Sequence, residues 1–276
     1  MNSPIPTTRW QPTQVEEAVR ERILSLAYAP AAWEQKVKLA AAFRALTHVG
    51  MVQGLYEGTY GHISLRVPGA ADYFWVNPWA TPFAQLTTDD MVLLSGQGEI
   101  IEGAAMHNFA AFFTHSSIHA ARPDVNCIVH THPCAGSAFA ALGLELQPID
   151  QIGCSFFEDV ALHEEYSGII AERSQSEDIV RSLGNKHALI LVNHGLLTCG
   201  STVEQAVISM YELERTCDIQ LRALASGRPP RLIPPDAARQ VRSIRTRPGR
   251  YKGEWNLLMR ELDSKGHQYV GTKRPR

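Results

Sequence analysis

The sequence lacks the features that mark membrane, secreted and nucleic-acid-binding proteins. No apolar run approaches the roughly 18 residues of a membrane span, and the N-terminus lacks the charged-then-apolar pattern of a signal peptide. The 26 basic and 28 acidic residues give a net charge of −2, so no basic surplus favours nucleic acid. The five cysteines are widely spread and form no CxxC pair. We therefore expect a cytoplasmic protein with reduced thiols that binds neither membranes nor nucleic acid.

The composition is that of an ordinary globular protein. Hydrophobic residues make up 45% and charged residues 20% of the 276 residues, which suits one large domain with appendages. Apolar residues recur at helical spacing in some segments and alternate in others, which predicts an α/β layered domain. The expected helices are 13–27, 33–50, 107–121 and 203–226, and the expected strands are 62–67, 73–77, 91–95, 125–132 and 187–195.

Two further segments have no clear periodicity. Residues 54–61 are rich in glycine, so we interpret them as turns. Residues 239–250 carry five arginines among proline and glycine. We interpret them as a solvated tail or a subunit contact, in preference to a nucleic-acid contact.

Three histidines stand where two predicted strands end. His130 and His132 are two residues apart on one strand, so their side chains point to the same face, and Pro133 ends that strand. His194 closes a second apolar strand before Gly195. Neutral imidazoles suit Zn, Fe, Mn, Co or Ni, and together the three predict a divalent-metal site. Taken singly, a surface pair and a capping histidine are the plainer interpretations.

Several segments between about Lys36 and Gly227 form a pattern in order and spacing, and these are Gly61-His62-Ile63-Ser64, Asn108 with Phe112, His115-Ser116, Ile118-His119, Arg122-Pro123-Asp124-Val125, His130-Thr131-His132-Pro133, Asn193-His194-Gly195-Leu196-Leu197 and Met210-Tyr211-Glu212-Leu213-Glu214. In this pattern the chain resembles the class II aldolase/adducin-head family, in its adducin-like branch. The resemblance implies a three-layer α/β/α sandwich around a mixed, largely antiparallel sheet at 36–227. An N-terminal arm and helix (1–35) and a C-terminal extension (228–276) flank this domain. The resemblance also implies His130, His132 and His194 as metal ligands and a homotetramer with sites at subunit interfaces.

The departures from the family pattern bear on the substrate. Sugar-phosphate aldolases of the family carry a Ser-Ser-Glu motif whose serines help to hold phosphate and whose glutamate is the acid/base. Here the three positions are Phe109, Ala110 and Ala111, the last of them 19 residues before His130. Alanine cannot move a proton and phenylalanine cannot donate to a phosphate. The two other phosphate segments read Gly61-His62-Ile63-Ser64 and Asn77-Pro78-Trp79-Ala80, so a sugar phosphate is not the expected substrate.

Other side chains are candidates for the missing chemistry. His115 and His119 share one face of the helix expected at 107–121, so either can be catalytic, with orientation of a neighbouring turn as the alternative. Asp150 lies in about the region where the dehydratase branch has its acid/base glutamate. The candidates for substrate binding are His62, Asn77 and Asn108. Three aromatic residues can line an aromatic-substrate pocket or the core, and these are Trp75, Trp79 and Phe83.

These observations favour a metal-dependent lyase. We expect decarboxylation or retro-aldol cleavage of a small, non-phosphorylated hydroxy or keto carboxylic acid, with Zn the first choice of metal and Fe(II), Mn or Co as alternatives. A non-haem Fe(II) oxygenase acting on a 2-oxo or 2-hydroxy acid is the second hypothesis, because a histidine triad leaves room for dioxygen. A non-catalytic, adducin-like structural module is the third.

Overall fold

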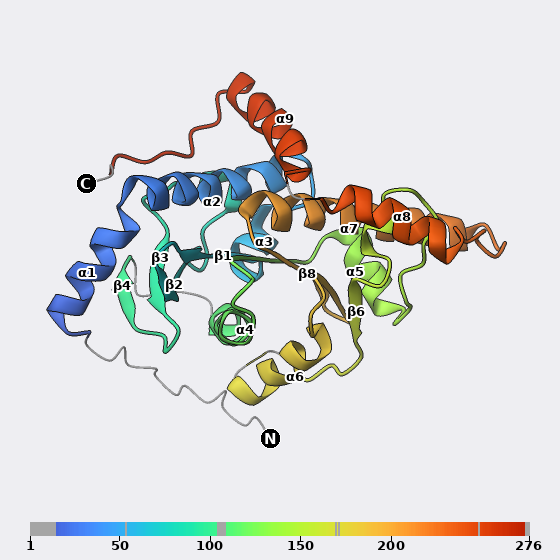
Figure 1. Ribbon diagram of the computed structural model, residues 1–276, viewed down its shortest axis with the longest axis horizontal. Helices are drawn as coiled ribbons and strands as arrows, with labels where there is room; N and C mark the ends of the chain where they lie inside the picture. The colour runs from blue at the N-terminus through green and yellow to red at the C-terminus, as the bar shows by residue number, and fades with distance from the viewer. Residues whose placement is uncertain are drawn as a thin grey trace.

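The computed structural model describes residues 15–52, 54–103, 109–168, 170, 172–247 and 249–273. An eight-stranded sheet with the order β4-β3-β2-β1-β5-β8-β7-β6 runs through its centre (Figure 1). Neighbouring strands are antiparallel except for β6 and β7, so the sheet is mixed and largely antiparallel, as expected. The strands are β1 (His62–Val67), β2 (Ala70–Val76), β3 (Val92–Ser95), β4 (Ile100–Glu102), β5 (Cys127–Thr131), β6 (Val160–His163), β7 (Ala188–Leu191) and β8 (Gly195–Gly200).

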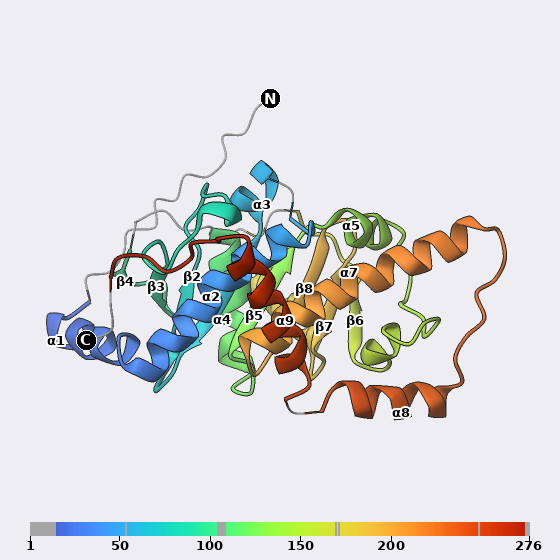
Figure 2. The ribbon, with the colours of Figure 1, turned by 90° about the horizontal axis from the view of Figure 1, so that it is seen from above.

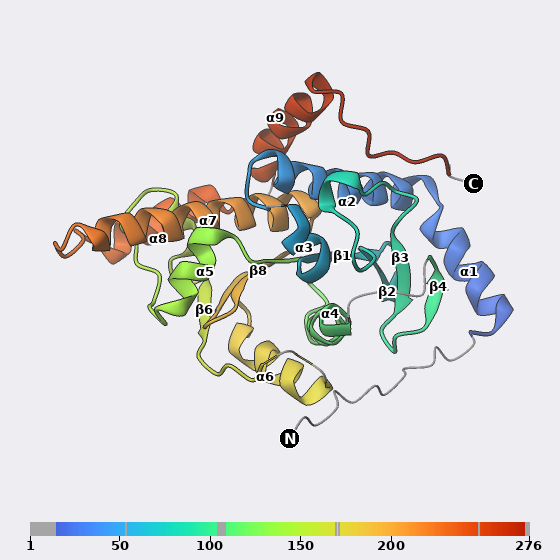
Figure 3. The ribbon, with the colours of Figure 1, turned by 180° about the vertical axis from the view of Figure 1, so that it is seen from behind.

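Helices cover both faces of the sheet and confirm the three-layer sandwich. On one face lie α2 (Pro30–His48) and α7 (Val203–Ala225), with α9 (Tyr251–Ser264) packed across both of them (Figure 2). On the other face lie α4 (Phe109–Ala121) and α6 (Arg173–Leu183), which pack against each other (Figure 3). None of the helices in the described ranges is long and apolar enough to cross a membrane. The remaining helices are α1 (Glu17–Ala27), α3 (Gly54–Tyr60), α5 (Cys134–Ala141), α8 (Pro235–Arg245) and the 3₁₀ turns η1 (Phe83–Gln85) and η2 (Gly153–Phe156).

The strands divide the core into two layers because successive side chains point to opposite faces. On β5, Cys127 and Val129 join the cluster under α2 and α7, whereas Ile128 joins the cluster under α4 and α6. His130 is two residues beyond Ile128, and therefore faces α4 and α6. His62 and Ser64 on β1 also face that side, since their side chains contact histidines of α4. The alternation thus places His62, Ser64 and His130 on the same face of the sheet.

Three segments differ from the sequence-based expectation. The segment at 54–61 contains the helix α3, not a series of turns. The strand expected at 187–195 ends at Leu191, and the next residues form a turn into β8. The arginine-rich segment at 239–250 is not a solvated tail, because it forms most of α8 and its Arg245 contacts Glu212 of α7. Each segment also contacts a distant part of the chain. Glu57 of α3 accepts a hydrogen bond from the backbone N–H of His132, and the N–H of Asn193 donates to the carbonyl oxygen of Ala140.

Candidate metal centre

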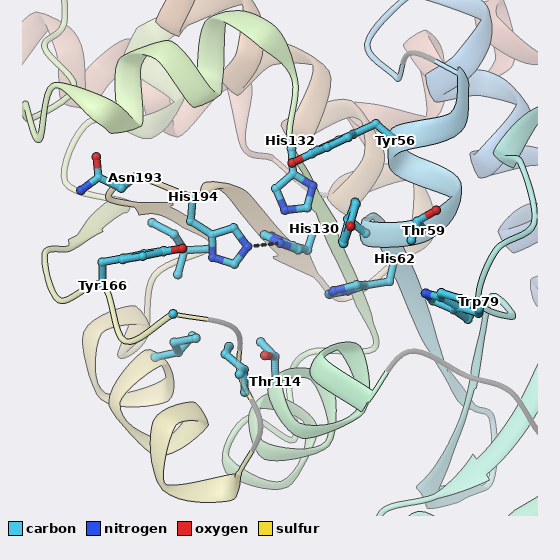
Figure 4. Close-up of a pocket in the computed structure, with 15 residues that line it drawn as sticks. Tyr56, Thr59, His62, Trp79, Thr114, His130, His132, Tyr166, Asn193 and His194 are labelled. Carbon is cyan, nitrogen blue, oxygen red and sulfur yellow. Dashed lines mark hydrogen bonds between the residues drawn. The ribbon is translucent and has the colours of Figure 1, made fainter. Parts of the chain in front are cut away.

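Three imidazoles meet at the end of the central strands β5 and β8. His130 lies on β5, His132 directly beyond it, and His194 in the turn that joins β7 to β8. One ring nitrogen of each lies within 4.8 Å of the others, and the Nε2 atoms of His130 and His194 are 3.2 Å apart (Figure 4). Within the described ranges these residues form the one cluster of three or more His, Cys, Asp or Glu side chains able to hold a metal ion.

The turn before β8 is shaped to carry His194 to the other two rings. Asn193 has a φ of 57°, a left-handed conformation that asparagine tolerates better than most residues. A Cβ atom on Gly195 would lie 2.7 Å from the carbonyl oxygen of Thr131 on β5. Glycine is therefore required where β8 passes the end of β5. The residues on both sides of His194 are thus explained by the backbone: Asn193 adopts the left-handed conformation, and Gly195 allows the close approach to β5.

Two of the three imidazoles have one nitrogen engaged outside the cluster. Nδ1 of His130 is 2.8 Å from the carbonyl oxygen of Leu196, so Nδ1 donates and Nε2 keeps its lone pair. Nδ1 of His132 faces Oε2 of Glu57 at 3.4 Å. Burial lowers the pKa of His130 well below its usual value and that of His194 to about 4. Neutral imidazoles with converging lone pairs are suitable donors for Zn²⁺ or Fe²⁺, so the three residues fit a divalent metal.

A fourth histidine, His62, extends the cluster into the interior. Its ring centroid is 4.8 Å from that of His130, and its Nδ1 is 2.7 Å from Nε2 of His115 on α4. Nδ1 of His115 is 2.6 Å from Oγ of Ser64, and that oxygen is 2.9 Å from Nε2 of His119. Residues two apart on β1 thus alternate with residues four apart on α4. Burial lowers the pKa of His115 to about 3 and holds the pKa values of His62 and His119 well below normal. These three histidines are therefore neutral at pH 7.

Two of the other predicted site residues, Asp150 and Asn77, do not line the cavity in front of the triad. The Asp150 carboxylate accepts hydrogen bonds from the backbone N–H groups of Ile152 and Gly153, and Asp150 does not line the cavity in front of the triad. The Asn77 side chain accepts from a backbone N–H and donates to two carbonyl groups, and it is also outside that cavity. Asn108 lies outside the described residues. The roles predicted for these three residues remain predictions.

A cavity of about 390 Å³ opens in front of the triad. Its lining, among the residues that the structure describes, contains no lysine, arginine, aspartate or glutamate. Four exposed aromatic side chains, two of which flank the histidines in Figure 4, surround it, and these are Tyr56, Tyr60, Trp79 and Tyr166. Ala111, at the acid/base position of the aldolase pattern, is buried on α4. The cavity therefore combines nitrogen ligands with an aromatic entrance.

Some residues of the site were missed in the sequence. Tyr56, Glu57 and Tyr60 lie on α3, whose helical conformation is hidden by its glycines. Glu57 and Gly61 are four residues apart, about one helical turn, but this spacing by itself is weak evidence that Glu57 belongs to the site. Trp79 lines the cavity, whereas two other candidate pocket aromatics, Trp75 and Phe83, are core residues. Tyr166 is exposed at the entrance of the cavity.

Two known proteins are similar to this chain in sequence over about 70% of its length. "Decarboxylase NovR" of Streptomyces niveus is 37% identical over 205 residues, which cover 74% of this chain and 74% of the relative. "4-hydroxy-3-prenylphenylpyruvate oxygenase/4-hydroxy-3-prenylbenzoate synthase" of Streptomyces roseochromogenus subsp. oscitans is 36% identical over 193 residues, 70% of this chain and 69% of the relative.

The fold is shared with solved structures as well. The "L-fuculose 1-phosphate aldolase from Glaciozyma antarctica PI12" superposes with a TM-score of 0.77 and 31% identity, covering 95% of this chain and 97% of that one. The sequence model described as "Class II Aldolase and Adducin N-terminal domain" matches residues 37–221. The chain therefore belongs to the class II aldolase and adducin N-terminal domain family.

Proposed function

We propose that this protein is a metal-dependent lyase that decarboxylates, or cleaves by a retro-aldol reaction, a small non-phosphorylated hydroxy or keto carboxylic acid. The observation that carries the proposal is the convergence of His130, His132 and His194 at a cavity whose described lining has no basic side chain. A bound divalent metal, with Zn expected before Fe(II), Mn or Co, supplies a Lewis acid for negative charge on a substrate oxygen. The decarboxylase name of one relative supports cleavage of a carbon–carbon bond.

The lining favours a substrate without phosphate. Proteins hold phosphate mainly with arginine, lysine and clustered N–H donors. The described lining offers no arginine or lysine, and Phe109 and Ala110 stand where phosphate-binding serines are expected. The structural relative named as a sugar-phosphate aldolase shares the fold, but these replacements argue against the same substrate here. A single carboxylate would bind at the histidine cluster, and the aromatic entrance would contact the apolar part of the molecule.

His62 is the side chain that we propose to orient the substrate. It lines the cavity beside the triad, and His115 occupies its Nδ1, which leaves Nε2 for a hydrogen bond to the substrate. Ser64 and His119 hold the ring of His115 from behind. The side chain of Ala111 has no titratable group. We therefore propose that His62 and His115 are the histidines outside the triad that are best placed to influence proton transfer.

A non-haem Fe(II) oxygenase is the second candidate. It is favoured by the 36% identity to a relative whose name includes an oxygenase, over 70% of this chain. The same three histidines would hold Fe(II). A non-catalytic module is the third candidate, and the buried Ala111 at the acid/base position is the observation that favours it.

Metal analysis is the first test. Purified wild-type protein is expected to hold close to one divalent ion per chain, and His130→Ala and His194→Ala are expected to lose it because each removes one of three ligands. His187→Ala is the matched control, since His187 lies outside the triad and pairs with Asp159. Full metal content in both triad variants would disprove the site.

Assays with two cofactors separate the three functions. Zinc-loaded and Fe(II)-loaded protein are incubated with a panel of 2-oxo and 2-hydroxy acids, with and without an aromatic side chain. Release of carbon dioxide or an aldehyde without oxygen uptake supports the lyase. Oxygen uptake only with Fe(II) supports the oxygenase, and inertness of both metal-loaded forms supports the structural module.

A further inference from the structure

We infer that Glu57 is a positioning residue for the metal ligand His132. We also infer that the Glu57 carboxylate has room in this position because Gly61 carries no side chain. This inference rests on the metal site of the proposed function. It assigns a carboxylate to the site from α3, although the aldolase carboxylate position on α4 is Ala111.

Both oxygens of Glu57 are directed at one residue. Oε1 accepts a hydrogen bond of 2.6 Å from the backbone N–H of His132, and Oε2 lies 3.4 Å from Nδ1 of the same residue. Glu57 is only 2% exposed. The carboxylate therefore holds His132 at its backbone and at its ring, just beyond the end of β5.

Among the described residues, no lysine or arginine forms an ion pair with Glu57. Among the ion pairs of the described residues, the one that includes Glu57 is with His132. A buried carboxylate without a counter-charge is costly, because it loses the hydration that it has in water. A divalent cation bound by Nε2 of His132 would place positive charge on the other side of the ring from Glu57, and this charge would offset that of the carboxylate. A carboxylate behind a metal-bound histidine fixes the tautomer and strengthens the nitrogen as a ligand.

Gly61 provides the space for this carboxylate. A Cβ atom built on Gly61 would lie 2.1 Å from Oε2 of Glu57, well inside contact distance. The backbone N–H of Gly61 also donates to the carbonyl oxygen of Glu57 over 2.9 Å, which closes the last turn of α3. An alanine at position 61 would displace the carboxylate while leaving the charge in the protein.

The test is the affinity of the metal-stripped full-length protein for Zn²⁺, measured by competition with a chromophoric chelator. Glu57→Gln retains an acceptor for the N–H of His132 but removes the charge, and it is expected to weaken Zn²⁺ binding about 10–100-fold. Glu214→Gln is the matched control. Glu214 likewise accepts hydrogen bonds from two backbone N–H groups, those of Ala135 and Gly136, just after the His132 segment. It is expected to bind Zn²⁺ with wild-type affinity.

Gly61→Ala tests the same contact without changing Glu57. Gly61→Ala is expected to weaken Zn²⁺ binding. The double variant is expected to bind Zn²⁺ no more weakly than Glu57→Gln alone, because the two changes disrupt the same contact between Glu57 and His132. Thermal melting of the metal-free variants checks that each is folded. If Glu57→Gln does not fold, Gly61→Ala carries the test.

The outcomes distinguish this inference from the proposed function. Wild-type affinity in folded Glu57→Gln or, where that variant does not fold, in Gly61→Ala overturns the role of Glu57 and leaves the metal site intact. Fully additive losses in the double variant overturn the role of Gly61. A wild-type protein that binds no Zn²⁺, Fe²⁺, Mn²⁺ or Co²⁺ overturns the metal site and this inference together.

Discussion

At the scale of single residues, the buried histidine chain behind the metal centre links the site to the stability of the fold. His62 contacts His115 directly, Ser64 joins His115 to His119, and all three rings are almost fully buried. Burial disfavours the charged form of each ring and holds its pKa well below normal, so the three histidines are neutral. The sequence indicated that His115 and His119 share a helical face. It did not indicate that β1 places Ser64 between them, because that contact joins segments about 50 residues apart.

This burial predicts that the metal-free protein loses stability in acid. The folded pKa of His115 is about 3, whereas the unfolded value is near 6.5. Between these pH values the unfolded chain binds a proton that the native chain does not. The free energy of unfolding therefore falls as the pH falls from 6.5 towards 3, by up to about 1.4 kcal/mol per pH unit for this histidine.

Urea unfolding of chelator-treated protein at several pH values measures this slope. The variant His115→Gln is expected to show a shallower slope than wild type, because one titrating group is gone. His187→Gln is the control, since that side chain is partly exposed and its ring already faces the Asp159 carboxylate. Identical slopes in wild type and His115→Gln would contradict the prediction.

At the scale of elements, one buried carboxylate of α7 contacts arginines from both C-terminal helical segments. Glu212 on α7 is 5% exposed, and its Oε1 lies 2.5 Å from guanidinium nitrogens of both Arg245 on α8 and Arg250 just before α9. Arg242 of α8 also donates to the carbonyl oxygen of Phe157. The basic character of this segment was clear in the sequence. Its partner was not, because Glu212 reads as one more polar residue on a long amphipathic helix.

Removing this carboxylate is expected to destabilise the protein substantially. Glu212→Gln would remove the carboxylate that faces Arg245 and leave Arg250 only its pair with the more exposed Glu254. The expected loss is about 3 kcal/mol of unfolding free energy. Asp218→Asn on the same helix breaks the exposed pair with Arg222 and is expected to cost less than about 1 kcal/mol. Chemical denaturation of the two variants in parallel checks the difference. Equal losses would mean that the cluster adds little beyond an exposed ion pair.

At the scale of the whole molecule, the histidine site lies at an open cavity whose rim is aromatic and exposed. Tyr56 and Tyr166 are each 58% exposed on opposite sides of the triad. Together with the family resemblance, these surfaces support our proposal of a homotetramer in which neighbouring subunits complete the site. The domain division at 36–227, between an arm and an extension, also remains a proposal.

Light scattering coupled to size exclusion measures the assembly directly. We expect a particle of four 30.6-kDa chains. Tyr56→Ala and Tyr60→Ala, on the rim, are expected to shift the assembly towards smaller species if the rim is a subunit contact, whereas Leu257→Ala on the far helix α9 is the exposed control. A wild-type monomer at micromolar concentration would contradict the proposal.

Local pattern alone determined the α/β character, most of the long helices and strands, and the three histidines, because these depend on periodicity and on residues at strand ends. Resemblance of the motifs added the three-layer arrangement and the loss of the aldolase acid/base at Ala111. Only the tertiary structure decided that α3 is a helix, that Glu57 stands behind His132, and that Asp150 is outside the cavity. These features depend on contacts between distant segments, whose hydrogen bonds and burial outweigh the weak local preferences of glycine-rich and polar sequence.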